Sequence, residues 1–137
     1  MLTASVDVDG QRIASIGPGL LAFIGISNQD TSAQVSWLAD KTLGLRIFAD
    51  ADKPMNKSIV DATGEILVVS QFTLTADVSR GRRPGFSTSA PPQTAEPLYQ
   101  EFVDALAREV PVQTGRFGAD MQVALVNDGP VTFLLER

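Results

Sequence analysis

The chain has 137 residues, a formal net charge of −5, 44% hydrophobic residues, and neither Cys nor His. That length suits one domain, residues 1–137, which is large enough to bury a core without staples. The two missing residue types exclude disulfides, Cys nucleophiles, zinc sites built on Cys or His, and catalytic triads with a histidine base. An enzyme made from this chain must therefore use carboxylates, hydroxyls, Lys or Arg, backbone amides or groups of its own substrate.

Strands are predicted in the first third of the chain. Residues 4–8 and 11–16 are β-rich runs joined by Asp9-Gly10, which is a two-residue hairpin signal. An apolar run over 20–26 follows Gly17-Pro18-Gly19. This glycine pair fits a relaxed dinucleotide-binding fingerprint, but that fingerprint must open a helix, whereas the pair here opens a β-rich run. We therefore favour a strand over a nucleotide site.

Two helices are predicted in the middle and later parts of the chain. The first is capped by Asp30 or Thr31 and runs to about Leu45, because apolar residues recur there at helical spacing. The second covers residues 94–109 and has Pro97 in its first turn, where proline is tolerated.

Further strands are predicted around the second helix. Residues 65–74 form an apolar strand that turns polar halfway, and residues 119–126 and 131–136 form two more strands joined by a turn. Because strands dominate and hairpins link neighbours, we predict an α+β fold. Its sheet is mostly antiparallel and curled toward a β-barrel, with the two helices packed on one side.

The sequence also bears on the cellular location. It has no run of about 18 apolar residues, so we expect no membrane span and no membrane partner. Residues 1–7 lack the basic start and apolar core of a signal peptide, and we expect a cytoplasmic protein. The acidic net charge argues mildly against a nucleic-acid partner, although a local basic cluster can still bind RNA.

Three segments carry groups that folding alone does not need. In the first, Ser70, Gln71, Phe72 and Thr73 place polar groups at the end of an apolar strand, where burial requires partners. An edge strand with side chains facing alternately in and out explains the same residues equally well.

The second segment is Asn127-Asp128-Gly129-Pro130-Val131-Thr132, and its local pattern favours an ordinary hairpin turn. In folded proteins about one X–Pro bond in twenty is cis, typically in a tight turn. A cis bond between Gly129 and Pro130 would point two successive carbonyls the same way and so form a rigid pair of acceptors.

The third segment holds the densest positive cluster of the chain, Arg80, Arg82 and Arg83, on a Gly/Pro loop. Such a loop can simply be solvated. Alternatively, the arginine forks match phosphate oxygens and Phe86 stacks on a base, which would make the loop an RNA-binding element.

Together these segments resemble the D-aminoacyl-tRNA deacylases, a family of dimeric editing enzymes. The resemblance covers nearly the whole chain from Ala4, and its motifs occur in the family's order. Members usually begin with several more residues, so either the true start lies upstream of Met1 or the chain lacks part of an inner strand. The matching segments are residues 70–74 and 127–132, supported by 45–48, 85–87, 90–92 and 114–121.

The resemblance implies hydrolysis of the ester between a D-amino acid and the 3′-terminal adenosine of tRNA, with glycyl-tRNA as a second substrate and no cofactor or metal. It implies that the neighbouring 2′-hydroxyl of the RNA assists the attack. Ser70 and Thr73 then have pocket and hydrogen-bonding roles, and backbone N–H groups near Gln71 and Phe72 hold the carbonyl oxygen.

The resemblance also implies a homodimer. In the family a cis Gly129–Pro130 pair enters the active site of the other subunit, binds the substrate's α-amino group through its carbonyls, and leaves no room for an L side chain. Met121 and Phe86 are expected beside the pocket or the adenine.

Two functions from other classes stay open. The first is a tRNA-binding module on this fold that releases no amino acid. The second is a small-molecule hydrolase that uses carboxylates such as Asp77 and Asp120 as acid and base, and that would cleave free esters without RNA.

Overall fold

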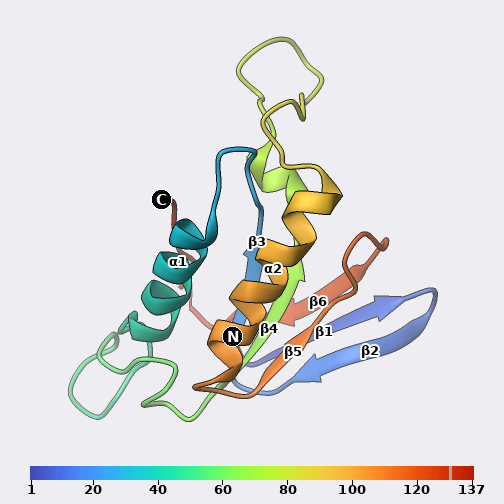
Figure 1. Ribbon diagram of the computed structural model, residues 1–137. Coiled ribbons are helices and arrows are strands. Elements are labelled where there is room, and N and C mark those ends of the chain that lie inside the picture. The colour runs from blue at the N-terminus through green and yellow to red at the C-terminus, as the bar shows by residue number, and fades with distance from the viewer. Residues whose placement is uncertain (130) are drawn as a thin grey trace.

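The computed structural model describes residues 1–129 and 131–137. Within these residues it contains two three-stranded sheets, two α-helices and one short 3-10 helix (Figure 1). The predicted α+β class with two helices is therefore confirmed. No helix in this described part is both long and apolar enough to cross a bilayer.

The first sheet is antiparallel and has the order β2-β1-β6. It comprises β1 (Thr3–Val8), β2 (Gln11–Ile16) and β6 (Gln122–Val126). The predicted hairpin turn between β1 and β2 is confirmed, because Asp9 and Gly10 both have positive φ angles, 51° and 77°. A two-residue turn of this hand matches the twist of the strands that it joins. β1 spans six residues and has a partner strand on each side.

The second sheet is parallel, which corrects part of the sequence prediction. Its order is β3 (Gly19–Ile24), β4 (Glu65–Ser70) and β5 (Val112–Thr114), and both strand pairs are parallel. A mostly antiparallel arrangement therefore holds for the first sheet only. The reason is that one helix lies between β3 and β4 and the other between β4 and β5, and such crossovers return the chain in the same direction.

The two helices are α1 (Ser32–Gly44) and α2 (Pro92–Ala107). Thr31 caps α1 as predicted, with a reciprocal capping box formed with Gln34. α2 begins two residues before the predicted start, because Pro92 occupies the first helical position, which suits a proline. Pro97 consequently lies in the second turn of α2 and not in the first.

β4 lies between two hydrophobic cores. Ile66 and Val68 pack with residues of both helices, whereas Leu67 and Val69 pack against residues of β1 and β2. All four side chains are at most 1% exposed. The molecule thus has three layers, with the helices covering one face of the parallel sheet and the antiparallel sheet covering the other (Figure 1). This confirms the prediction that both helices pack on one side.

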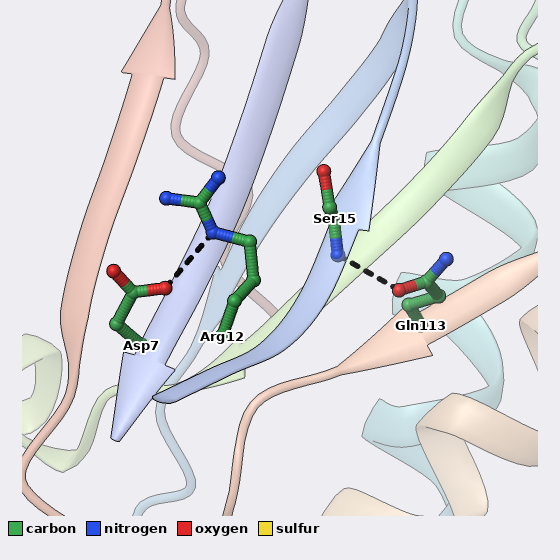
Figure 2. A network of polar contacts seen from close by, with 4 residues as sticks. All are labelled: Asp7, Arg12, Ser15 and Gln113. Carbon is green, nitrogen blue, oxygen red and sulfur yellow. Dashed lines mark hydrogen bonds and ion pairs between the residues drawn. The ribbon is translucent and has the colours of Figure 1, made fainter. Parts of the chain in front are cut away.

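The two sheets also meet along an edge. The Ser15 N–H of β2 donates to Gln113 Oε1 of β5 at 2.9 Å (Figure 2). Nearby, an ion pair between Arg12 Nε and Asp7 Oδ1 (3.0 Å) joins β2 and β1 within the antiparallel sheet. The hydrogen bond joins β2 and β5, which are edge strands of the two sheets.

Two strand predictions differ from the structure. Residues 131–136 form no strand, and the chain reaches β6 through a short strand, β5, that the sequence pattern did not indicate. After residue 130 the C-terminal segment continues to α1, where Arg137 Cζ lies 5.1 Å from the centre of the Trp37 ring. A β-rich segment without a neighbour in its own chain cannot form a ladder, whatever its propensity.

Candidate active site

The polar end of the predicted strand 65–74 is a turn. Ser70 ends β4 opposite Ile24, and the Gln71 N–H donates to the Ile24 carbonyl at 2.8 Å. The chain then forms a 3-10 helix, η1 (Phe72–Thr75), in which the Leu74 N–H donates to the Gln71 carbonyl at 3.1 Å. The edge-strand alternative for this segment is therefore wrong.

Two backbone donors in η1 are unpaired. Within the described part of the chain the N–H groups of Phe72 and Thr73 have no hydrogen-bond acceptor, and no side chain caps the turn. Two adjacent free N–H groups can hold a carbonyl oxygen that gains negative charge. The Gln71 N–H already donates to the Ile24 carbonyl of β3. Of the backbone donors predicted near Gln71 and Phe72, the N–H groups of Phe72 and Thr73 therefore stay as candidates.

The side chains of η1 offer no catalytic base. Gln71 Nε2 donates to Thr73 Oγ1, so the hydroxyl of Thr73 accepts a bond from an amide, which does not take up protons near neutral pH. Among the described residues this is the one hydrogen-bond partner of the Thr73 hydroxyl. The geometry is consistent with Thr73 as a hydrogen-bonding residue and gives no support to Thr73 as a nucleophile.

Phe86 lies beside η1, although it is thirteen positions after Thr73 in the sequence. Its ring centroid is 5.2 Å from that of Phe72 and the planes are tilted by 56°. Phe86 is 44% exposed and Phe72 is 57% exposed, so both remain accessible to solvent. The structure therefore brings two of the predicted site residues together and leaves their faces open to a planar ligand.

The arginine cluster lies on a hairpin-like loop that follows η1. The N–H groups of Asp77 and Gly85 donate to each other's carbonyls at 2.8 and 2.9 Å and close the loop at its base. Arg80, Arg82 and Arg83 are exposed, and in the described residues none of them forms an ion pair. The segment between β4 and α2 projects beyond the body of the molecule (Figure 1), so a large anionic partner can reach the three guanidinium groups.

Asp77 is engaged at the base of this loop. Its Oδ1 accepts from the Ser79 hydroxyl at 2.6 Å and from the Ser79 N–H at 2.9 Å, and these bonds hold the pKa of Asp77 below its ordinary value. A carboxylate stabilised in its charged form is a weak acid–base catalyst near neutral pH. Asp120 is exposed before β6, far along the chain from Asp77. Nothing in the geometry favours the small-molecule hydrolase that would pair these carboxylates.

Met121 and Gly129 lie outside η1, on either side of β6. Met121 packs against the core of the first sheet, and its Sδ accepts from the Arg116 N–H at 3.4 Å. Gly129 is exposed, and a Cβ added there would collide with the backbone nitrogen of Val131, so the position requires glycine. Pro130 lies outside the described residues, and the predicted cis bond stays a prediction.

A groove of about 820 Å³ lies between α1, β3 and the C-terminal segment. None of the described residues that the sequence nominated for the site lines this groove. The groove instead takes in neighbours of both motifs, of which the most relevant are Gly25, Leu74, Thr75, Asn127, Val131 and Thr132. Sequence reasoning did not single out Gly25 and Thr75, because their contacts join segments that are distant in the sequence.

Comparisons with known proteins agree on the family. The sequence model of the family D-Tyr-tRNA(Tyr) deacylase matches residues 1–136. The D-aminoacyl-tRNA deacylase of Chlorobaculum parvum is 57% identical over 135 residues, which cover 97% of this chain and 91% of that protein. The D-aminoacyl-tRNA deacylase of Idiomarina loihiensis is 52% identical over 134 residues, which cover 97% of this chain and 92% of that protein. The chain belongs to the D-aminoacyl-tRNA deacylase family.

Solved structures share this fold. The deacylase fold described above superposes on the c-Myc DNA Unwinding Element Binding Protein with a TM-score of 0.94 and 41% identity, covering 99% of this chain and 93% of that one. It also matches a probable eukaryotic D-amino acid tRNA deacylase with a TM-score of 0.73. That second likeness has 19% identity over 90% of this chain and 88% of the other, and it concerns the fold alone.

Proposed function

We propose that this chain, a D-aminoacyl-tRNA deacylase, holds the carbonyl oxygen of the ester with the Phe72 and Thr73 N–H groups while the RNA supplies the assisting hydroxyl. The observation that carries the proposal is that, among the described residues, the Phe72 and Thr73 N–H groups of η1 have no hydrogen-bond acceptor. One such donor typically contributes about 3–4 kcal/mol of transition-state stabilisation. The absence of His and Cys from the chain suits a reaction that needs no protein nucleophile.

In this mechanism water attacks the ester carbon with assistance from the 2′-hydroxyl next to the esterified 3′ oxygen. The carbonyl oxygen becomes negative and is held by the two N–H groups. The bond from the carbon to the 3′ oxygen then breaks, which releases the D-amino acid and restores the 3′-hydroxyl of the tRNA. Holding an intramolecular hydroxyl in place can remove about 7–11 kcal/mol of a barrier. Phe86 and Phe72 contribute a stacking surface for the terminal adenine.

The active form is a homodimer in which Gly129 and Pro130 of one subunit complete the site of the other. In the described part of the chain, Gly19 of β3 is hydrogen-bonded to Met1, but no strand pairs with the rest of the outer edge of β3. The β-rich segment 131–137 likewise has no strand partner among the described residues. Unpaired edges and exposed apolar side chains favour association with a second copy. Apolar residues of β3, β6 and the C-terminal segment are 42–74% exposed, and they are Phe23, Leu125, Val126, Phe133 and Leu134.

Selectivity follows from this arrangement. Carbonyls of Gly129 and Pro130 bind the α-amino group and fill the space that an L side chain would need. Glycine has no side chain to exclude, so glycyl-tRNA is a second substrate. The three arginines of the loop bind the tRNA backbone, and the enzyme meets its charged tRNA in the cytoplasm. Met121 supports the pocket from the core of the first sheet.

The test is hydrolysis of D-tyrosyl-tRNA, L-tyrosyl-tRNA and glycyl-tRNA by the purified protein, with its oligomeric state measured in the same buffer. We expect rapid loss of the D and glycyl esters with the L ester spared, by a dimer. Loss of the L ester as well would show that the filter is not assembled. Binding of all three without release of amino acid would instead favour the tRNA-binding module.

A further inference from the structure

The turn η1 is tied to the loop before α2 by three hydroxyl groups. Thr75 Oγ1 donates to the Phe72 carbonyl at 2.7 Å and lies 2.5 Å from Ser89 Oγ. Thr88 Oγ1 donates to the Thr75 carbonyl at 2.5 Å. Thr75 and Ser89 are both half-buried. These bonds connect η1 with residues 88–89 before α2 and hold the two segments in a fixed relative position.

The direction of these bonds follows from the number of protons. A hydroxyl has one proton to donate. Because Thr75 gives its proton to the Phe72 carbonyl, Ser89 is the donor in the contact between the two hydroxyls. Hydrogen bonds arranged in series in this way polarise one another, so the bond from Thr75 to Phe72 is strengthened by Ser89.

The bond to the Phe72 carbonyl also determines the orientation of a neighbouring donor. The Phe72 carbonyl and the Thr73 N–H belong to one planar peptide unit, in which they point in opposite directions. A hydroxyl that holds the carbonyl therefore also holds the direction of the N–H. The Thr73 N–H is one of the two groups without an acceptor in the described part of the chain.

We propose that Thr75 is a positioning residue, which aims the Thr73 N–H at the substrate carbonyl through the Phe72–Thr73 peptide; this rests on the proposed role of the two N–H groups. A Thr hydroxyl often bonds a carbonyl one turn earlier without any function. The difference here is that Ser89 and Thr88, from another segment, lock the rotamer and the backbone of Thr75.

The experiment compares Thr75→Val, which keeps the shape and removes the hydroxyl, with Thr75→Ser, which keeps the hydroxyl. Loss of one hydrogen bond of ordinary strength predicts a fall in kcat of about 2- to 12-fold for Thr75→Val on D-tyrosyl-tRNA. KM stays within twofold of wild type, because the bond acts on the developing charge, and Thr75→Ser keeps the wild-type kcat. A merely structural role would lower the melting temperature without separating kcat from KM. A folded Thr75→Val protein with wild-type kcat would overturn the inference.

Two further variants make the outcome unambiguous. If Thr75→Val does not fold, Ser89→Ala replaces it; a fall in its kcat of about twofold or more with unchanged KM supports the inference, and an unchanged kcat refutes it. Replacing Thr73 by its α-hydroxy acid removes the N–H itself. If that change lowers kcat while Thr75→Val does not, the N–H role stands and the inference about Thr75 fails. If it leaves kcat unaltered, the proposed role of the N–H fails as well.

Discussion

An alanine at Gly25 should displace η1 and slow deacylation. Gly25 directly follows β3, and a Cβ built there would lie 2.9 Å from the Gln71 carbonyl oxygen, 3.0 Å from Leu74 Cβ and 3.2 Å from Thr75 Cγ2. Because these neighbours include backbone, the turn must move by a few tenths of an ångström. A misplacement of about 1 Å costs about a hundredfold in rate, so a shift of this size predicts a fall in kcat of about four- to tenfold. Overpacking of this kind also costs about 1–3 kcal/mol of folding free energy.

The assay is single-turnover hydrolysis of D-tyrosyl-tRNA together with a thermal melt, in which each kcal/mol lowers the midpoint by about 3–5 °C for a chain of this size. Gly44→Ala is the matched control, since Gly44 ends α1, is exposed, and has nothing within 4 Å of an added Cβ. We expect the control to keep the wild-type rate and to gain up to about 1 kcal/mol from helix propensity. A Gly25→Ala protein with wild-type rate would refute the claim that the position of η1 controls the reaction.

Three further outcomes are expected. Thr73→Ala should keep its deacylation rate within about tenfold, because it loses one side-chain hydrogen bond and no nucleophile; a loss of several orders of magnitude in a folded protein would contradict RNA-assisted catalysis. Changing the three arginines of the loop 78–84 to Gln should weaken tRNA binding and flatten its salt dependence, while Arg108→Gln should not; an unchanged salt slope would return the loop to a solvated role. The lowered pKa of Asp77 means that its bonds to Ser79 stabilise the loop fully above the ordinary aspartate pKa of 3.8 and are lost as the pH falls through the lowered value. The Ser79 amide signal in NMR should therefore titrate below pH 3.8, and a midpoint at or above that value would contradict the assignment.

The features that the sequence predicted well are local ones. The turn at Asp9-Gly10 depends on two residues that accept positive φ, and the start of α1 depends on a cap and a partner three residues away. Each of these patterns is complete within a few positions. The polar segment after Val69 could also be singled out from the sequence as a candidate, because polar groups at the end of a buried strand need hydrogen-bond partners in any tertiary arrangement.

The features that the sequence did not predict depend on distant partners. Apolar strands such as β3 and β4 carry the same pattern whether they pair parallel or antiparallel, so the direction follows only from where the helices return the chain. The packing of Phe86 on Phe72, and of Ser89 on Thr75, depends on a loop path that no local signal fixes. Residues 131–136 have a strand pattern but no strand partner in the part of the chain that the structure describes, which is why propensity alone gave the wrong element.

The use of backbone N–H groups in η1 affects which mutations are expected to be damaging. A backbone N–H is present whatever side chain a codon specifies, with proline as the one exception among the twenty amino acids. Most missense changes at Phe72 or Thr73 thus leave the donor itself intact, whereas a change at Gly25, which donates nothing, alters where it points. Selection on such a site acts on the path of the chain, and damaging variants should concentrate at positions that shape that path.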